Sequence, residues 1–151
     1  MLDWMLLPFK RYAEFSGRSR RMEYWSFVLL NVIVYVVFGA IMMAGGFSLA
    51  ALSDPTATPP QPGALFYVGA GLLGLYALAV FIPNLAVNVR RLHDRNMSGW
   101  FLLLFIVLSA IPFIGILVSI GWLVLMCLPG TPGPNKYGAD PKDPASAEVF
   151  A

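Results

Sequence analysis

Three long stretches without a charged side chain limit what this chain can fold into. They cover residues 24–46, 64–89 and 100–128. A helix rises about 1.5 Å per residue and the hydrocarbon core of a bilayer is about 30 Å thick, so about 20 apolar residues cross it. Composition agrees, because 58% of the residues are hydrophobic and 12% are charged, against about 45–50% and about 25% in soluble domains. The sequence predicts an all-α, multi-pass membrane protein.

The first two runs predict transmembrane helices at 24–46 and 64–89. The first run is longer than the core of a cleaved signal peptide, which has about 7–15 apolar residues. Ser19 precedes it and is predicted as its N-cap. The connection at 47–63 contains SDPTATPPQPG, and its prolines and glycine predict a loop.

The third run, residues 100–128, is long for one crossing and short for two. Pro112 and Gly115 interrupt it near the middle. Two interpretations stay open: one tilted and kinked helix, or a hairpin of two short helices that turns near these residues. The only cysteine, Cys127, lies in this run and is predicted to be a buried thiol.

The two ends of the chain differ from the apolar runs. Residues 2–15 place apolar side chains at helical spacing, and this segment is too short to span, which predicts a helix lying in the membrane interface. Proline and glycine recur after residue 128 and disfavour regular structure. We predict one integral membrane domain over residues 1–141 and a flexible tail over 142–151.

Basic residues flank the spans unevenly. Five precede the first span, three follow the second, and residues 47–63 contain none. By the positive-inside rule the N-terminus is then cytoplasmic. Lys136 and Lys142 weakly favour a cytoplasmic C-terminal segment as well, which would require the hairpin.

The polar stretch 84–100 holds the candidate binding residues. If the second helix continues past Val89, helical spacing puts four polar side chains on one stripe. They are Asn84, Asn88, Arg91 and Arg95. Such a stripe could bind an anion, a lipid phosphate or a partner's acidic group, or line the path of a small transporter or channel. The simpler interpretation is that arginines at a helix end fix the topology.

Within this stretch two pairs suggest chemistry. Arg90 and Asp94 are four residues apart and are predicted to pair. His93, the only histidine, stands beside Asp94, and the two could act as base and acid in a lipid-acting enzyme. The chain has no nucleophile elbow and no metal-ligand spacing. We therefore predict a non-enzymatic protein without metal or cofactor.

A second group of charges is predicted to share the cytoplasmic face with Arg90 and Arg91. Its members are Arg18, Arg21, Glu23, Asp94 and Asp140. Arginine–carboxylate pairs among them would lock the helices together, or leave an arginine-rich pocket for a lipid headgroup; the carboxylates favour locking. The segment after residue 128 would cap this group or form a plain ordered turn.

The partners follow from where the charges lie. Basic residues next to apolar spans favour anionic phospholipid over nucleic acid, which we exclude. A homo-oligomer or another membrane protein is the further predicted partner.

Three motifs resemble the DUF805 family of small bacterial inner-membrane proteins. The first comprises Phe15, Gly17, Arg18, Arg21, Glu23, Tyr24 and Trp25. The second comprises Arg90, Arg91, Leu92, His93 and Asp94, followed by Ser98, Gly99 and Trp100. The third comprises Gly130, Gly133, Asn135, Tyr137, Gly138, Asp140 and Pro141. The resemblance covers about residues 12–141 and implies a small multi-pass membrane protein of uncharacterised activity.

Overall fold

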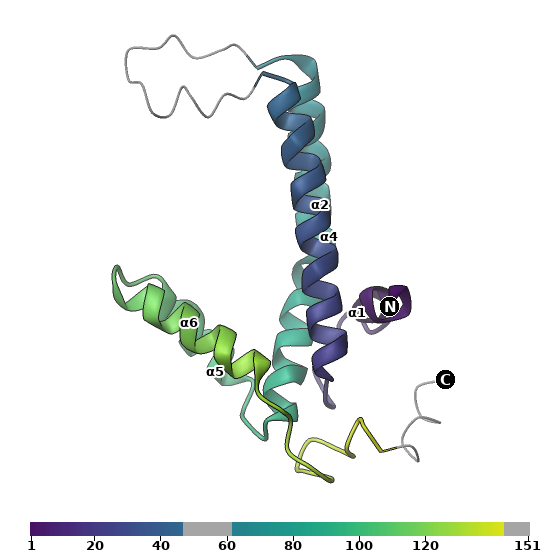
Figure 1. Cartoon of the computed structure of the whole chain (residues 1–151), viewed down its shortest axis with the longest axis vertical. Coiled ribbons are helices and arrows are strands. Elements are labelled where there is room, and N and C mark those ends of the chain that lie inside the picture. The colour runs from purple at the N-terminus through teal and green to yellow at the C-terminus, as the bar shows by residue number, and fades with distance from the viewer. Residues whose placement is uncertain (47–61, 144–151) are drawn as a thin grey trace. The chain divides into compact units, whose positions relative to one another are not determined.

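The structure, a computed structural model, describes residues 1–46 and 62–143, and every regular element in these ranges is a helix. The helices are α1 (Leu2–Lys10), α2 (Arg21–Ala44), α4 (Ala64–Asp94), α5 (Trp100–Ser109) and α6 (Ile114–Cys127) (Figure 1). The predicted all-α class is confirmed. Most of the predicted loop, and residues 144–151 of the predicted flexible tail, lie outside the described residues.

Two compact units make up the chain. The first combines Met1–Phe27 with Ile82 onward, and the second is Val28–Phe81. The long helices α2 and α4 each contribute to both units. The single domain predicted over residues 1–141 stays a prediction.

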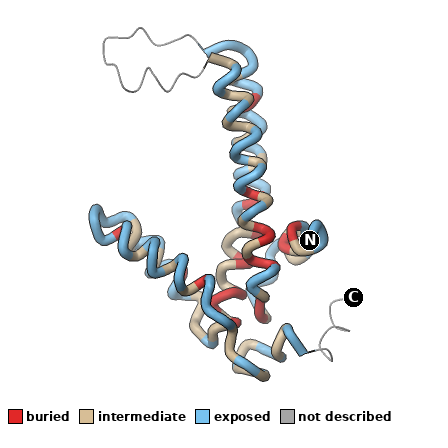
Figure 2. Tube along the Cα trace, in the orientation of Figure 1, coloured by how far each residue is buried: buried red, intermediate tan, exposed pale blue. Residues whose placement is uncertain are grey.

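Helices α2 and α4 are long and apolar enough to cross a membrane, judged by length and composition. Their most apolar 18-residue windows have mean hydropathies of 2.5 and 2.2, and 11% of each window is buried. The core helix of a soluble protein would be mostly buried, whereas most residues of these two helices are exposed or half-buried (Figure 2). Helix α4 runs to Asp94, so the continuation past Val89 is confirmed.

Polar side chains in the second unit satisfy one another. The Tyr76 hydroxyl donates a hydrogen bond to Asn31 Oδ1 at 3.1 Å, and the Tyr76 ring meets Tyr35 edge-on at 6.0 Å. Asn31 is buried, and a buried amide needs such a partner. This pair therefore joins α2 to α4 within the apolar stretch.

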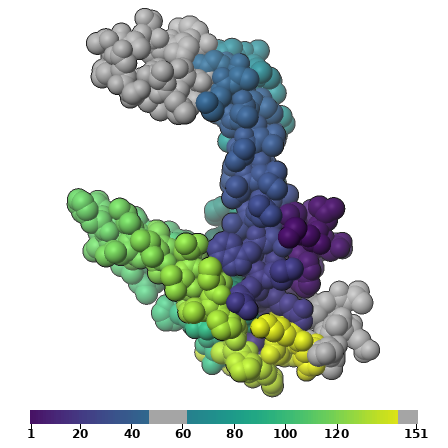
Figure 3. Space-filling model, viewed as in Figure 1, coloured from purple at the N-terminus to yellow at the C-terminus, as the bar shows by residue number. Residues whose placement is uncertain are grey.

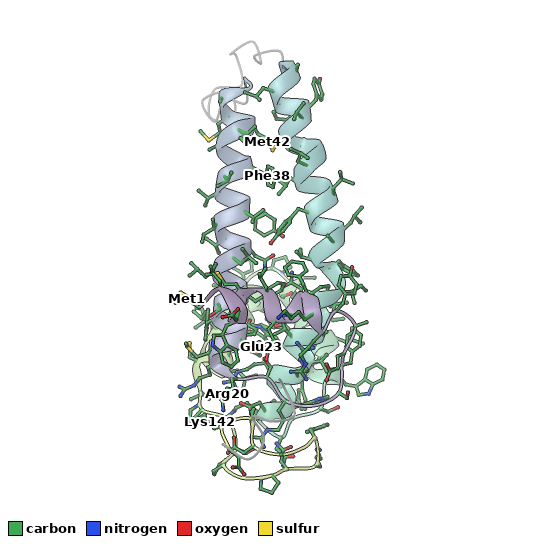
Figure 4. The ribbon with its side chains drawn as sticks, turned by 90° about the vertical axis from the view of Figure 1, so that its right-hand side faces the viewer. Met1, Arg20, Glu23, Phe38, Met42 and Lys142 are labelled. Carbon is green, nitrogen blue, oxygen red and sulfur yellow. The ribbon has the colours of Figure 1, made fainter. Side chains whose placement is uncertain are left out.

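The core of the first unit gathers where α2 begins and α4 ends. Its buried apolar side chains come from α1, α2, α4, α5 and α6 (Figure 2). They are Met5, Tyr24, Phe27, Ala86, Val87, Leu92, Leu102 and Met126. Helix α1 packs across the first turns of α2, where Phe9 meets Phe27 edge-on at 5.5 Å (Figures 3 and 4).

Helix α1 ends at Lys10, so the predicted helix over residues 2–15 is too long. The reason is a competing donor. Arg90 Nη1 donates to the carbonyl oxygens of Arg11 and Glu14, which turns this backbone toward α4 instead of into further helix. Arg11 also pairs with the Glu14 carboxylate at 2.7 Å. That hydrogen bond lowers the pKa of Glu14 below its ordinary value.

The predicted N-cap role of Ser19 is wrong. Helix α2 begins at Arg21, and Ser19 Oγ is buried without a hydrogen-bond partner among the described residues. The Ser19 amide donates instead to the Arg90 carbonyl oxygen at 3.1 Å. Ser19 thus ties the turn before α2 to the end of α4.

Helices α5 and α6 fold back on each other, which decides between the two interpretations of residues 100–128. The rings of Phe105 and Trp122 stack with centroids 4.2 Å apart, so the hairpin is confirmed. The two helices have 10 and 14 residues, or about 15 and 21 Å, and each is shorter than the hydrocarbon core. Cys127 is exposed at the end of α6, so its predicted burial is wrong.

Candidate functional site

Residues 90–95 at the end of α4 connect the other segments of the first unit. Successive side chains on a helix diverge by about 100°, so neighbouring residues face different segments. Arg90 contacts the segment after α1, Arg91 the end of α6, and Asp94 the turn before α2. We call the buried group of Arg18, Glu23, Arg90, Arg91 and Asp94 the arginine cluster.

Asp94 is the carboxylate shared by two arginines of the cluster. Arg18 Nε donates to Asp94 Oδ1 at 3.0 Å, and Arg91 Nη1 donates to Oδ2. The exposed fractions are 4% for Arg18, 0% for Arg91 and 4% for Asp94. A charge buried this deeply without a partner destabilises the folded protein by roughly several kcal/mol. The three side chains therefore stabilise the fold only when all of them are present.

Arg90 pairs with Glu23, and the predicted Arg90–Asp94 pair is wrong. Arg90 Nη2 donates to Glu23 Oε1 at 2.8 Å, and both side chains are buried. The four-residue spacing did not predict the partner of Arg90, because the Glu23 carboxylate on α2 lies within hydrogen-bond distance of it. Asp94 instead accepts hydrogen bonds from Arg18 and Arg91. Two of the cluster's ion pairs, Arg18–Asp94 and Glu23–Arg90, therefore join different segments, and Arg91–Asp94 lies within α4.

Arginines also bind the carbonyl oxygens at the end of α6. The pairs are Arg91 with Met126 and Leu128, Arg21 with Cys127, and Arg95 with Pro129. A helix leaves its last carbonyl oxygens without helical partners and carries partial negative charge at its C-terminus. The guanidinium groups supply donors and positive charge there, so they fix the hairpin to α2 and α4.

The predicted polar stripe is not a continuous track. Its members Arg91 and Arg95 both reach the end of α6. Asn88 Nδ2 donates to the Asn84 carbonyl oxygen at 2.7 Å, a bond within α4. Neither asparagine joins the arginine cluster among the described residues, so the stripe divides into two separate parts.

His93 and Asp94 are adjacent in sequence but have separate partners. His93 Nδ1 lies 3.2 Å from the Gly17 carbonyl oxygen, which can only accept, so Nδ1 carries the proton. The imidazole stacks on Tyr137, with centroids 3.8 Å apart and planes 5° from parallel. Gly17 has φ of 80°, which glycine adopts without strain. The ring thus joins the turn before α2 to the C-terminal segment.

We call the described C-terminal segment, residues 129–143, the tail. The tail caps the C-terminal end of α4. The Thr131 amide donates to the Asp94 carbonyl oxygen at 2.8 Å, and Asn135 Nδ2 donates to the His93 carbonyl oxygen at 2.9 Å. Arg18 donates to the carbonyl oxygens of Thr131 and Gly133, both at 2.6 Å. The capping interpretation is confirmed, and the tail covers the arginine cluster.

Asp140 organises the far part of the tail. Its carboxylate accepts hydrogen bonds from the backbone amides of Lys142 at 2.9 Å and Gly133 at 3.0 Å. Asn135 and Gly138 pair through their backbones between these two positions. The amide of Lys142, and then that of Gly133, hold the pKa of Asp140 below its ordinary value.

This lowered pKa predicts that the tail loosens in acid. The folded tail favours the ionised carboxylate, so the contribution of Asp140 is complete above about pH 4 and is lost as pH falls through the lowered pKa. Hydrogen exchange at the Gly133 amide, corrected for intrinsic rates, measures it. Asp140→Asn should exchange faster at neutral pH and lose this acid dependence. Constant protection of wild type throughout the acid range would contradict the prediction.

The remaining motif residues shape a groove beside His93. Ser98, Gly99 and Trp100 lie at the start of α5, and they line a groove of about 480 Å³ with His93 and Tyr137. A Cβ on Gly99 would lie 2.8 Å from Val89 Cγ1, so glycine permits this approach of α5 to α4. Trp100 is largely exposed. Trp25 meets Tyr24 edge-on at 5.3 Å.

A second pocket contains basic residues that sequence reasoning did not select. It has a volume of about 410 Å³ and lies between α1, the turn before α2 and the tail. Its lining residues are Asp3, Trp4, Leu7, Lys10, Arg11, Arg18, Arg20, Glu23 and Pro141. We call it the basic pocket. The amphipathic pattern of residues 2–15 was the available signal, because an interfacial helix places its cations near lipid phosphates.

Metal binding finds no support in the described ranges, where no group of three His, Cys, Asp or Glu side chains could hold an ion. The described carboxylates of the cluster already accept from arginines. The chemistry of the site is therefore ion pairing and hydrogen bonding.

Comparison with known proteins agrees with this architecture. The profile of the family described as "Protein of unknown function (DUF805)" matches residues 12–139. The chain belongs to this family. Family membership confirms the resemblance of the three motifs, which lie almost wholly inside the matched range.

Two relatives of this chain are named as inner-membrane proteins. "Inner membrane protein YhaI" of Escherichia coli K12 is 43% identical over 141 residues, covering 93% of this chain and 97% of the relative. "Inner membrane protein YhaH" of the same strain is 41% identical over 142 residues, covering 93% and 98%. No solved structure matches the chain. With the apolar helices α2 and α4, these relatives identify an integral protein of the inner membrane.

Proposed function

We propose that this protein is a non-enzymatic accessory protein that crosses the inner membrane more than once and meets anionic phospholipid at its cytoplasmic face. One observation carries the proposal. Every guanidinium nitrogen of the cluster except Arg90 Nε donates to an internal acceptor, while Lys10 and Arg20 form no ion pair among the described residues. The cluster then serves as a structural lock, and the outer cations face the lipid.

The distribution of basic residues supports a cytoplasmic N-terminus. All ten Lys and Arg residues fall in the unit formed by Met1–Phe27 and Ile82 onward, and Val28–Phe81 contains none. Positive residues near span ends are retained on the cytoplasmic side. The tail belongs to the same unit and caps the end of α4, which supports a cytoplasmic tail as well.

The geometry supports accessory over catalytic or transport roles. Asp94 accepts from two arginines, so it is not available to His93 as an acid–base partner. A transport path needs polar groups along a span, but Asn31 bonds to Tyr76 and Asn88 bonds within α4. The buried charges hold the helices together, and the helices expose apolar side chains. This arrangement suits a protein that binds lipids, a second copy of itself or a membrane partner.

Native mass spectrometry of protein extracted in a mild detergent tests the proposal. We expect retained anionic phospholipid in excess over its share of the extracted lipid, because exposed cations at a membrane surface attract it. Retention of lipids in proportion to the extract would contradict lipid recognition. A lipid mass that changes during incubation, and no longer changes in His93→Ala, would contradict a non-enzymatic role.

A further inference from the structure

We propose that the basic pocket binds the phosphate of an anionic glycerophospholipid, with Lys10 and Arg20 as the binding cations. This site rests on the lipid recognition proposed above and names the residues that perform it. They differ from the arginines that the sequence selects, because those arginines lie inside the lock.

The charges that line the pocket single out these two cations. Arg11 pairs with Glu14, Arg18 with Asp94, and Glu23 with Arg90. Each of these ion pairs joins a lining residue to a partner outside the lining, and Arg11 also pairs with Glu23 within the lining at 3.9 Å. Among the charged lining residues, this leaves Lys10, Arg20 and Asp3. Two cations against one carboxylate give a net positive pocket, as a phosphate diester requires.

Arg20 is held at the pocket by an aromatic ring. Its guanidinium carbon lies 5.9 Å from the centroid of the Trp4 ring, a cation–π contact. Figure 4 shows Arg20 beyond α1 on the side of the tail, where Lys142 lies. Lys10 is exposed in the last turn of α1. A rigid planar donor and a mobile ammonium group therefore border the same cavity.

The surface of α1 identifies a lipid as the source of the phosphate. Met1, Leu2 and Leu6 are exposed by 72%, 73% and 48%, while Met5 and Pro8 are buried against the unit. A helix with an outward apolar face lies at the boundary of headgroups and acyl chains. Leu7 and Trp4 also give the pocket apolar walls. A glycerophospholipid would place its phosphate by Lys10 and Arg20 and its chains along α1.

Two matched double variants test the site. Lys10→Gln with Arg20→Gln removes the proposed cations, and Lys136→Gln with Lys142→Gln removes the same charge from the tail without touching the pocket lining. Short-chain phosphatidylglycerol, phosphatidylcholine with the same chains and inorganic phosphate are titrated into each detergent-solubilised protein. Native mass spectrometry reports the bound fraction, and thermal melting confirms folding.

Wild type should bind phosphatidylglycerol more tightly than phosphatidylcholine. Loss of two cations should weaken the binding of phosphatidylglycerol about 30-fold in the pocket variant, at about 1 kcal/mol per cation. The binding of phosphatidylglycerol to the tail variant should weaken much less. Equal weakening in both variants would overturn the pocket while general lipid recognition stands. No preference in wild type would overturn the proposed function itself. Inorganic phosphate that binds through Lys10 and Arg20 without any lipid binding would overturn the lipid source.

Discussion

Asp94→Asn is expected to destabilise the protein by about 3–5 kcal/mol, because it leaves two buried arginines without their shared carboxylate. Arg18 and Arg91 are 4% and 0% exposed, and neither forms an ion pair with another carboxylate of the described residues. The Asn side chain keeps the shape and one acceptor oxygen but removes the charge. The loss therefore reports electrostatics and not a cavity.

Thermal melting in detergent measures this loss. Asp143→Asn is the control, since it makes the same chemical change at an exposed residue of the tail and should shift the midpoint little. Equal melting of Asp94→Asn and wild type would mean that the cluster contributes no net stability. In that case the lock would not explain the burial of its arginines.

Gly130→Ala is expected to displace the tail and cost about 1–3 kcal/mol or more, as overpacking does in a tight core. A Cβ on Gly130 would lie 2.6 Å from Asp94 Cγ. Clashes with the end of a flexible side chain are usually relieved by a rotation. Here Arg18 and Arg91 hold both oxygens of Asp94, so relief requires breaking an ion pair or moving the tail.

Hydrogen exchange of the tail and thermal melting both measure this change. The Thr131 amide, which donates to the Asp94 carbonyl oxygen, should lose protection. Gly121→Ala is the matched control, because a Cβ built there meets no atom within 4 Å apart from its chain neighbours and the local helix backbone. Alanine also favours a helix interior over glycine by about 1 kcal/mol. A Gly130→Ala tail as protected as wild type would contradict the close packing.

The fold was largely predictable because membrane spans follow from uncharged length alone. The runs at 24–46 and 64–89 became α2 and α4 with small shifts at their ends. Pro112 and Gly115 correctly marked the break in the third run but could not decide between a kink and a hairpin. That outcome depends on the packing of Phe105 on Trp122 and on arginines from α2 and α4 at the end of α6.

The site was predictable in its members and not in its pairs. Arg18, Glu23, Arg90, Arg91 and Asp94 were all selected from the sequence, and they do form one cluster. Arg21 and Asp140 were predicted in the same group, but Arg21 donates to the Cys127 carbonyl oxygen and Asp140 accepts from backbone amides of the tail. Helical spacing predicted Arg90 with Asp94, because it considers only one helix. Tertiary contacts supplied Glu23 and Arg18 as nearer partners. The basic pocket escaped notice because Lys10 and Arg20 become neighbours only when α1 folds across α2.

A double-mutant cycle of Arg18→Gln and Asp94→Asn tests most directly whether the cluster is a lock between segments. Thermal and denaturant unfolding in detergent give the stability of wild type, the two single variants and the double variant. We predict a coupling of roughly 1–3 kcal/mol, because Asp94→Asn alone leaves Arg18 buried without its carboxylate, and adding Arg18→Gln removes that charge. The loss of the Arg91–Asp94 pair is common to both Asp94 variants and cancels in the cycle. Strictly additive losses would contradict the lock and would leave the arginines open to a ligand.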